Sequence, residues 1–342
     1  MSAKCQYPYG GPAVSGLLKS TAEDFVVTEN LGFEPGGEGE HLFLWIEKKR
    51  LTTHDLIDHV VRDFSIKSRD IGHSGLKDKI AVTRQWLSLY LPGQMKLLEL
   101  PEISEYKILD HAWHHRKLRT GTHRSNHFEV IIRNVAAVPE ISWKQLDLVR
   151  SRGMANYFGA QRFGRQGDNV EQALQILTNT RRARKLSRNK RSLYISAMRS
   201  FLFNTVLSRR IELGYWDKPV AGDVFMLSGS QSIFYEKIND ALLARFDQLD
   251  LSSTISLYGD GKRLLQDDAL NLEDLVFAQY DAILQCLIQQ KTRLQMRATR
   301  VMVEDLNVDY DAVESALRVE VTLPSGSYFT TLLDHFIDVE QA

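Results

Sequence analysis

The sequence predicts an α+β protein in which a helix-rich domain interrupts a sheet-rich one. Strand-like segments fill the first third of the chain and return at residues 319–323. Between them, from about residue 142 to residue 297, apolar residues recur mainly at helical spacing. The chain has 342 residues, a length that favours more than one domain. We therefore expect a discontinuous domain, 1–151 and 304–342, around an inserted domain, 152–303.

The first third is expected to contain several strands and one clear helix. Segments rich in β-branched and aromatic residues predict strands at 24–29, 42–46, 81–91 and 128–133. A Gly-rich loop, 32–39, separates the first two strands. Thr52 or Thr53 is expected to cap a helix, because apolar residues follow at helical spacing. Those residues are Leu56, Ile57, Val60, Val61 and Phe64.

The middle of the chain shows its clearest helical periodicity at residues 193–213, 235–249 and 272–288. A strand is expected again at 319–323, and Pro324 separates it from a final amphipathic helix. Strands on both sides of a helix-rich region are the reason for expecting an inserted domain rather than two consecutive domains.

The composition excludes several classes of protein. Lysine and arginine total 43, as do aspartate and glutamate, so the formal net charge is zero. Overall charge therefore does not indicate a nucleic-acid partner, and only local basic patches can do so. Cys5 and Cys286 are too few for a disulfide framework or a multi-cysteine metal site. The sequence shows no secretory signal and no apolar run of about 18 residues. We expect a soluble, cytoplasmic protein that does not enter a membrane.

A basic segment at residues 181–191 contains seven Lys or Arg residues among eleven, and no acidic residue. Such a density suits neutralisation of nucleic-acid phosphates. The alternative is a solvated basic face that opens the following helix, or an exposed loop. The candidate RNA-binding residues of this segment are Arg181, Arg182, Arg184 and Lys185.

A second basic segment, residues 107–127, contains five of the ten histidines. Their spacing does not match a metal-binding helix, so no metal site is expected. We interpret the segment as a loop that contacts phosphates and bases, with Arg116 and Lys117 as candidate RNA-binding residues and Trp113 beside them. A plain surface loop is the alternative.

A turn at residues 73–86 presents Asp78 between Lys77 and Lys79 at the start of a strand. Flanking cations stabilise the ionised carboxylate that a nucleophile or base requires. Taken alone, such a turn is more often part of the surface than of an active site. The sequence has no phosphate-binding loop, no dinucleotide-binding glycine motif and no nucleophile elbow, so nucleotide cofactors and serine hydrolysis are not indicated.

Five segments in order resemble the motifs of the TruD family of tRNA pseudouridine synthases. They are residues 22–29 (AEDFVVTE), 75–86 (GLKDKIAVTRQW), 125–128 (SNHF), 156–164 (NYFGAQRFG) and 323–328 (LPSGSY). Together they span almost the whole chain. The resemblance implies the pseudouridine-synthase catalytic fold, a mixed and mainly antiparallel sheet with flanking helices. It also implies that the family's own TRUD domain, rich in helices, is the inserted domain.

The same resemblance implies that the protein isomerises uridine to pseudouridine at position 13 of transfer RNA. Asp78 matches the family's catalytic aspartate. The reaction has no net redox or hydrolytic change, so no cofactor and no metal are expected. A uridine within folded RNA must leave its stack to react, and we expect it to enter a pocket between the two domains.

Several further residues are implied to bind the substrate. By matching the motifs, Phe25, Asn126 and Tyr328 contact the target nucleotide, and Phe128 packs against the uracil. Lys19 is expected to pair with Asp78. Phe25 and Phe128 could instead be ordinary core residues of their strands, and a shift of one residue would exchange Tyr328 with its neighbour. Transfer RNA is the expected partner, and the chain is expected to be a monomer without a protein partner.

Two other functions remain open at this point. An RNA-binding protein without catalytic activity would use the same basic segments but would not need Asp78. An RNA methyltransferase would need a Gly-rich loop for its methyl donor after a strand, and the sequence shows none. A glycosidase would need two opposed carboxylates, whereas the turn offers one.

Overall fold

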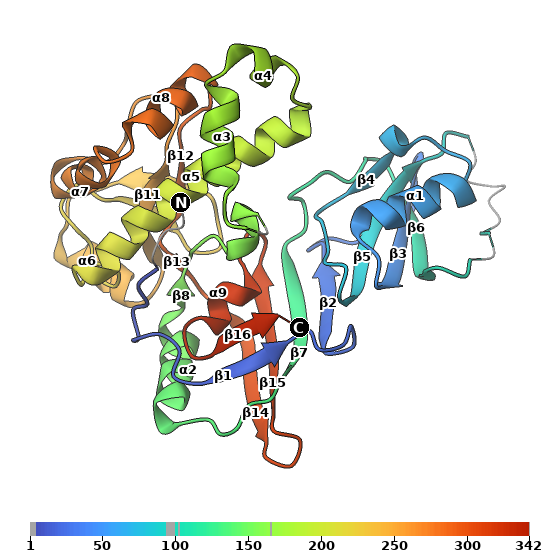
Figure 1. The fold of residues 1–342 in the computed structure, drawn as a ribbon, viewed down its shortest axis with the longest axis horizontal. Helices are drawn as coiled ribbons and strands as arrows, with labels where there is room; N and C mark the ends of the chain where they lie inside the picture. The colour runs from blue at the N-terminus through green and yellow to red at the C-terminus, as the bar shows by residue number, and fades with distance from the viewer. Residues whose placement is uncertain (1–4, 94–99, 102, 165, 342) are drawn as a thin grey trace. The chain divides into compact units, whose positions relative to one another are not determined.

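The computed structural model describes residues 5–93, 100–101, 103–164 and 166–341 (Figure 1). The chain forms two compact units. One, here called the sheet unit, comprises Ala13–Ser142, Val303–Gly326 and Ile337–Ala342. The other, here called the helical unit, comprises Met1–Pro12, Trp143–Met302 and Ser327–Phe336. Each unit thus combines segments that are far apart in the sequence.

The sheet unit is built on one large mixed sheet. Its central order is β14-β15-β7-β2-β5-β3-β6, with β1, β4 and β16 attached beside it. Most neighbours are antiparallel, whereas β2 pairs with β5, and β1 with β16, in parallel. The strands are β1 (Ser15–Leu18), β2 (Phe25–Asn30), β3 (His41–Lys49), β4 (Ile71–His73), β5 (Val82–Tyr90), β6 (Lys107–His114), β7 (Ser125–Arg133), β14 (Glu304–Asp311), β15 (Ala316–Pro324) and β16 (Asp338–Gln341). The expected mixed, mainly antiparallel sheet is confirmed.

Helix α1 (Thr53–Asp63) covers one part of this sheet. Thr52 caps it, because its hydroxyl accepts the backbone N–H of Asp55 while the Asp55 carboxylate accepts that of Thr52. Leu56 and Val60 of the helix pack with the apolar residues of β3 and β5. A short 3₁₀ turn, η1 (Ser68–Asp70), leads on to β4. The predicted helix start and its cap are confirmed.

Strand β7 lies between β2 and β15 and sets the register of the centre of the sheet. Phe128 lies opposite Val27 on one side and Val321 on the other. Asn126, two residues earlier, lies opposite Glu29. Since side chains alternate along a strand, Asn126 and Phe128 are on the same face.

The helical unit contains both helices and a second sheet. Its four-stranded sheet has the order β10-β9-β11-β12, and a two-stranded pair joins β8 to β13. The chain passes from the sheet unit to the helical unit within α2. The elements are α2 (Glu140–Arg152), β8 (Met154–Ala155), η2 (Ala160–Phe163), α3 (Asn169–Leu177), α4 (Thr180–Arg184), α5 (Arg188–Glu212), β9 (Val224–Leu227), β10 (Ile233–Tyr235), α6 (Asp240–Asp247), β11 (Leu251–Leu257), α7 (Asp267–Phe277), α8 (Asp281–Gln289), β12 (Gln295–Ala298), β13 (Arg300–Val301) and α9 (Phe329–Leu333).

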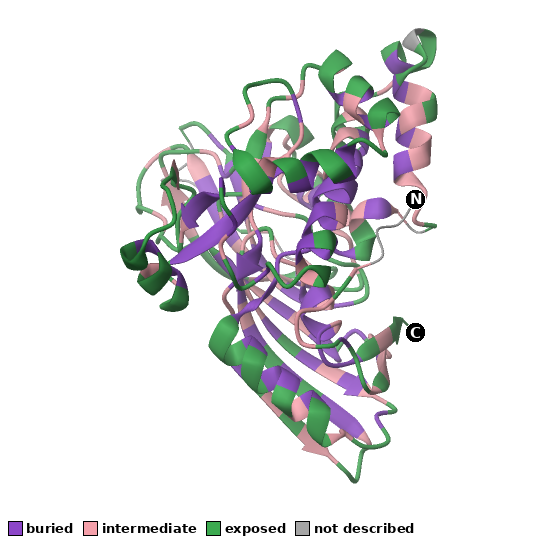
Figure 2. Ribbon diagram, turned by 90° about the vertical axis from the view of Figure 1, so that its left-hand side faces the viewer, coloured by how far each residue is buried: buried purple, intermediate pink, exposed green. Residues whose placement is uncertain are grey.

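The long helix α5 passes through the core of the helical unit. Tyr194, Phe201 and Leu207 are buried along it with residues of α3, α7 and α8. In both units, buried residues concentrate on the strands and on the helix faces turned toward them (Figure 2).

The structure corrects two expectations about the middle of the chain and adds strands that were not predicted. Residues 235–249 are not one helix, because β10 ends at Tyr235 and α6 begins at Asp240. Residues 272–288 form two helices, because α7 ends at Phe277 and α8 begins at Asp281. The strands of the second sheet were not predicted. β9 and β11 are buried on both faces, and serine and threonine make up much of β11, so neither strand shows a polar–apolar alternation.

His335 gives the helical unit a pH-dependent stability. Its ring is completely buried, Nε2 accepts the Ala155 N–H at 3.1 Å, and Nδ1 lies 2.8 Å from the Thr331 carbonyl oxygen. Burial lowers its pKa to about 4, against 6.5 for an exposed histidine. The unfolded chain therefore binds the additional proton first as the pH falls through this interval.

We expect the free energy of unfolding to decrease from pH 6.5 to pH 4 by up to about 1.4 kcal/mol per pH unit through His335. His335→Gln should flatten this dependence, because an amide cannot take up the proton. Urea unfolding of both proteins at a series of pH values measures the two slopes. Identical slopes would contradict this assignment.

Candidate functional site

Asp78 lies in the turn between β4 and β5 of the sheet unit, and half of its side-chain surface (52%) is exposed. The Nζ atom of Lys19 lies 2.6 Å from its carboxylate. Lys19 is itself largely buried, has a left-handed backbone with φ of +61°, and places Nζ 4.3 Å from the centre of the Phe25 ring. The carboxylate is thus fixed by one ammonium group while remaining open to solvent.

The backbone of this turn is held by a second lysine, Lys48 of β3. Its side chain is buried, and Nζ donates to the carbonyl oxygens of Asp78 at 2.9 Å and Leu51 at 2.5 Å. Burial lowers the pKa of Lys48 to about 8, an effect that the charge of Asp78 partly opposes. Lys48 therefore ties the end of β3 to the residue that carries the exposed carboxylate.

A third lysine, Lys77, connects this turn to the centre of the sheet. Its Nζ lies 2.9 Å from Glu29 Oε2 and donates to Asn126 Oδ1 at 2.6 Å. Both members of the Lys77–Glu29 pair are buried. Glu29 also accepts the Ser74 hydroxyl at 2.5 Å and the Trp86 N–H at 3.2 Å. This pairing satisfies the carboxylate and, because an ammonium can only donate, identifies the Asn126 atom that faces Lys77 as the oxygen.

The other end of the Asn126 amide faces His123, with Nδ2 and Nε2 3.2 Å apart. Burial, and then the nearby charge of Lys77, lower the pKa of His123, which favours the neutral ring as an acceptor. Asn126 is therefore oriented from both sides, by a cation at its oxygen and by an imidazole at its nitrogen.

Phe25, whose ring lies under Lys19 Nζ, also contacts Phe128. Their rings meet edge to face with centroids 6.2 Å apart, and 3% and 8% of their surfaces are exposed. This burial agrees with the alternative role of both residues in the core. The structure thus brings together five of the predicted residues in the sheet unit: Asp78, Lys19, Phe25, Phe128 and Asn126.

Tyr328 belongs to the helical unit, where it precedes α9. Its hydroxyl accepts hydrogen bonds from Arg162 Nη2 at 2.5 Å and Nε at 3.0 Å, and its ring meets Phe158 at a centroid distance of 6.0 Å. Both partners come from the 156–164 segment. Phe329 is buried, whereas Tyr328 is half-buried, so Tyr328 is the more accessible of the two.

The basic residues divide into two groups. Arg181, Arg182, Arg184 and Lys185 are exposed on and just after α4, and none of them pairs with a carboxylate in the part of the chain that the structure describes. In the sheet unit Arg116 is exposed, but Lys117 donates to the Arg69 carbonyl oxygen at 2.5 Å.

The interpretation of residues 107–127 as a loop is wrong for much of its length. Residues Lys107–His114 form strand β6, because they pair with β3, and β7 already begins at Ser125. His114 has a structural role, since its Nδ1 accepts a hydrogen bond from the Gly36 N–H at 3.0 Å. Within the described residues, no group of three or more His, Cys, Asp or Glu side chains is arranged to hold a metal ion.

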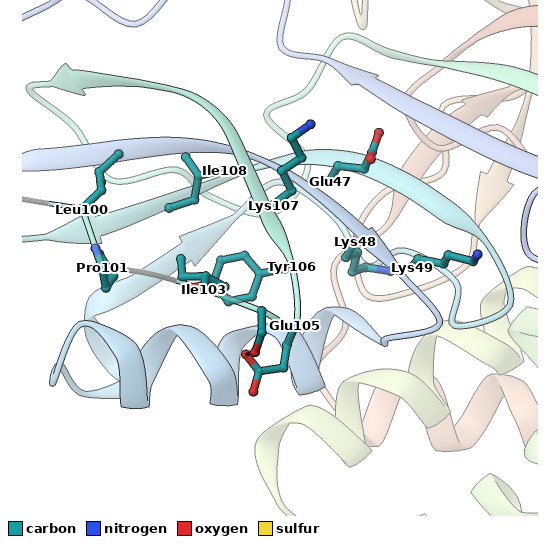
Figure 3. Close-up of a pocket in the computed structure, with 11 residues that line it drawn as sticks. Glu47, Lys48, Lys49, Leu100, Pro101, Ile103, Glu105, Tyr106, Lys107 and Ile108 are labelled. Carbon is teal, nitrogen blue, oxygen red and sulfur yellow. Dashed lines mark hydrogen bonds between the residues drawn. The ribbon is translucent and has the colours of Figure 1, made fainter.

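A hollow of about 540 Å³ lies along β3 and β6, beside Tyr106 and Glu105 (Figure 3). None of the individual residues predicted to bind substrate or RNA lines it. Two of its lining residues, Lys107 and Ile108, belong to the segment 107–127 that was expected to be an RNA-contacting loop. A smaller hollow of about 300 Å³ is lined by Lys19, which pairs with Asp78, and by Lys79, which follows Asp78 in the chain.

Sequence reasoning missed the supporting roles of Lys48, Glu29 and Lys77. No signal was present for Lys48, because it follows the predicted strand 42–46 in a charged stretch, residues 47–50, that is typical of an exposed surface. The partners of Glu29 could not be identified either, because they come from segments distant in the sequence.

Comparison with known proteins identifies related sequences along nearly the whole chain. The family model described as tRNA pseudouridine synthase D (TruD) matches residues 4–182 and 168–336. The tRNA pseudouridine synthase D of Methylococcus capsulatus is 37% identical over 338 residues, which cover 97% of this chain and 94% of that protein. That of Chromohalobacter salexigens is 39% identical over 330 residues, covering 95% and 93%.

The fold is also similar to a solved structure. The crystal structure of the putative tRNA pseudouridine synthase D from Methanosarcina mazei matches with a TM-score of 0.71 at 22% identity, covering 96% of this chain and 95% of that one. The described residues contain no helix long and apolar enough to cross a membrane.

Lys48 should leave a distinct signature in the pH dependence of stability. Its pKa is about 8 in the folded protein and 10.5 when exposed, because burial penalises the ammonium ion. Lys77 acts in the same direction, whereas Asp78 and Asp55 oppose it. Between these pH values the unfolded chain binds more protons, so this contribution makes the folded protein more stable as the pH rises.

We expect Lys48→Met to remove a rise in unfolding free energy of up to about 1.4 kcal/mol per pH unit above pH 8. Urea unfolding of both proteins from pH 7 to pH 9.5 measures the difference in slope, which does not depend on the general destabilisation caused by the substitution. A Lys48→Met protein with the same slope as the unaltered protein would show that Lys48 does not titrate in this range.

Proposed function

The chain belongs to the TruD family of tRNA pseudouridine synthases, and from this premise we propose that it converts uridine 13 of transfer RNA to pseudouridine without a cofactor. It is an enzyme of the isomerase class. The N1–C1′ bond breaks, the uracil turns, and C5 bonds to C1′. The C5 hydrogen leaves as a proton and N1 takes one up, so atoms and charge balance. With transfer RNA as substrate, the cytoplasm is its proposed location.

The observation that carries the proposal is the Asp78 carboxylate, exposed to solvent and held by Lys19 at 2.6 Å. We assign it the catalytic role, in attack on the nucleoside or removal of a proton. Its setting supports this assignment in two ways. The side chain is accessible to a substrate, and its backbone is held by the buried Lys48. Catalysis requires a reactive group that the substrate can reach and that is held in a fixed geometry, and Asp78 meets both conditions.

Substrate recognition is proposed to use the residues around this carboxylate. The NH₂ group of Asn126 is a candidate donor to the uracil, since Lys77 already occupies the amide oxygen. Phe25 and Phe128 are almost completely buried, so a base could contact only their edges. Tyr328 is assigned to the substrate on the basis of its family motif. Flipping the uridine out costs roughly a few kcal/mol, which such contacts offset.

We propose that the exposed cations of α4 contribute to RNA affinity. Arg181, Arg182, Arg184 and Lys185 have no carboxylate partner in the described part of the chain, so they are available to phosphates. Arg116 is a further candidate. Lys117 is a weaker one, because a carbonyl oxygen already accepts from its ammonium.

The catalytic role of Asp78 is tested by the substitution Asp78→Asn. Transfer RNA transcripts that carry tritium at C5 of uridine should release tritium to water with the unaltered protein, and EDTA should not prevent it. Asp78→Asn should lower the rate by roughly 10³-fold or more, because the amide can neither attack nor accept a proton. Binding of transfer RNA should change little.

Asp58→Asn is the matched control, because Asp58 is exposed on α1 and has no role in the proposed site. It should release tritium at the unaltered rate. Turnover by Asp78→Asn would refute the catalytic assignment. Tight binding without any release by the unaltered protein would instead indicate an RNA-binding protein without this activity.

The contribution to RNA affinity is tested on the four cations of α4 and its C-cap. Their joint replacement by glutamine should weaken RNA binding and reduce the salt dependence, log K against log[salt], by about 0.9 for each phosphate that the variant no longer neutralises. The control replaces four scattered exposed lysines of the helical unit, Lys218, Lys237, Lys262 and Lys291. Equal slopes for both variants would assign this segment to an ordinary solvated surface.

A further inference from the structure

The smaller hollow of the sheet unit is lined by cations from three segments. Lys19 follows β1, Arg50 follows β3, and Lys79 follows Asp78. Arg50 has a left-handed backbone with φ of +57°, and its N–H donates to the Ala81 carbonyl oxygen at 3.3 Å. This bond fixes Arg50 beside the turn, so the convergence of the three cations follows from the backbone geometry.

The charge of these cations is only partly compensated. Asp78 pairs with Lys19, and the nearby Glu23 pairs with Lys49. Arg50 and Lys79 form no ion pair with a carboxylate among the residues that the structure describes. The hollow, of about 300 Å³, is therefore lined by two cations without an ion-pair partner among the described residues; Glu23 and Asp55 interact with Arg50 and Lys79, respectively, only at longer range. Such a site favours an anion.

A hydroxyl group on one of the lining residues also lacks a partner. Ser20 lines it, and its Oγ atom is buried without a hydrogen-bond partner in the described part of the chain. A buried hydroxyl without a partner costs free energy, and a rotation of the Ser20 side chain toward the hollow would let a ligand accept its hydrogen bond and recover that cost. A phosphate oxygen is such an acceptor and is also attracted by the neighbouring cations.

We propose that this hollow binds one phosphodiester group of the RNA backbone next to the target uridine. The inference rests on the proposed function, because it takes Asp78 to act on the sugar of that nucleotide. Lys19 both holds Asp78 and lines the hollow, and Lys79 directly follows Asp78. An anion in the hollow would therefore contact the lysine that holds Asp78 and the residue that follows Asp78 in the chain. The contact positions the flipped nucleotide and reads no base identity.

The test combines a change in the protein with a change in the RNA. Transfer RNA transcripts are assembled with a single neutral methylphosphonate 5′ of the target uridine, 3′ of it, or at a distant position. Their affinities are measured for the unaltered protein and for Arg50→Gln/Lys79→Gln. Lys67→Gln/Arg69→Gln is the control, because it removes one lysine and one arginine from an exposed part of the same unit.

We expect one of the two adjacent methylphosphonates to weaken binding by the unaltered protein roughly tenfold. The same RNA should bind Arg50→Gln/Lys79→Gln no more weakly than its unmodified counterpart, because this variant lacks the two cations of the hollow that form no ion pair, and the remaining Lys19 is paired with Asp78. The control variant should retain the tenfold effect. Thermal unfolding of all three proteins checks that the substitutions leave the fold intact.

If Arg50→Gln/Lys79→Gln loses as much affinity on methylphosphonate substitution as the unaltered protein, the proposed phosphate site is refuted. Equal sensitivity of the unaltered protein to all three positions would also refute it. These outcomes are separate from failure of the proposed function, which is measured by tritium release with the unaltered protein and unmodified RNA. If the unaltered protein releases tritium but its sensitivity to the methylphosphonate does not depend on Arg50 and Lys79, this inference alone is refuted.

Discussion

Removing the Glu29 carboxylate and the Lys77 ammonium from water costs roughly several kcal/mol for each ion. The sheet unit offsets this cost by giving the carboxylate the donors of Ser74, Trp86 and Lys77, and by giving Lys77 a second acceptor in Asn126. The contacts of this one pair therefore join β2, β5, β7 and the turn that carries Asp78. A pair satisfied in this way has little freedom to move, and the residues proposed to meet the uridine are positioned through it.

Three lysines of the sheet unit serve three different purposes within a short distance. Lys77 links the turn to the sheet, Lys48 holds its backbone, and Lys19 pairs with its exposed carboxylate. All three lysine side chains are largely buried, whereas the Asp78 carboxylate that Lys19 holds is half exposed to solvent. The rigidity of the turn is thus separated from the reactivity of its side chain, which lets Asp78 remain exposed without being mobile.

Much of this architecture could be predicted from the sequence. Helix α1 was predictable because its cap and its apolar residues are local, and the strands β2, β5, β7 and β15 because their composition is typical of strands. The family motifs indicated Asp78 and Asn126, and Lys19, just upstream of the first motif, was expected to pair with Asp78. Strands β9 and β11 were not predictable, because both of their faces are buried and no alternation appears. The partners of Glu29 and Lys48 were not predictable either, since tertiary packing brings them together.

The parallel pairing of β1 with β16 has a consequence for the synthesis of this protein. Ser15 lies beside Asp338, so the edge of the sheet unit stays incomplete on the ribosome until the segment around Asp338 has emerged. The packing of the helical unit is also completed late, because the hydrogen bond between Ala155 and His335 joins residues that are 180 positions apart. Nascent chains therefore expose unpaired strand edges throughout translation, and such non-local contacts form slowly. The folding of this protein should depend on what shields those edges during translation.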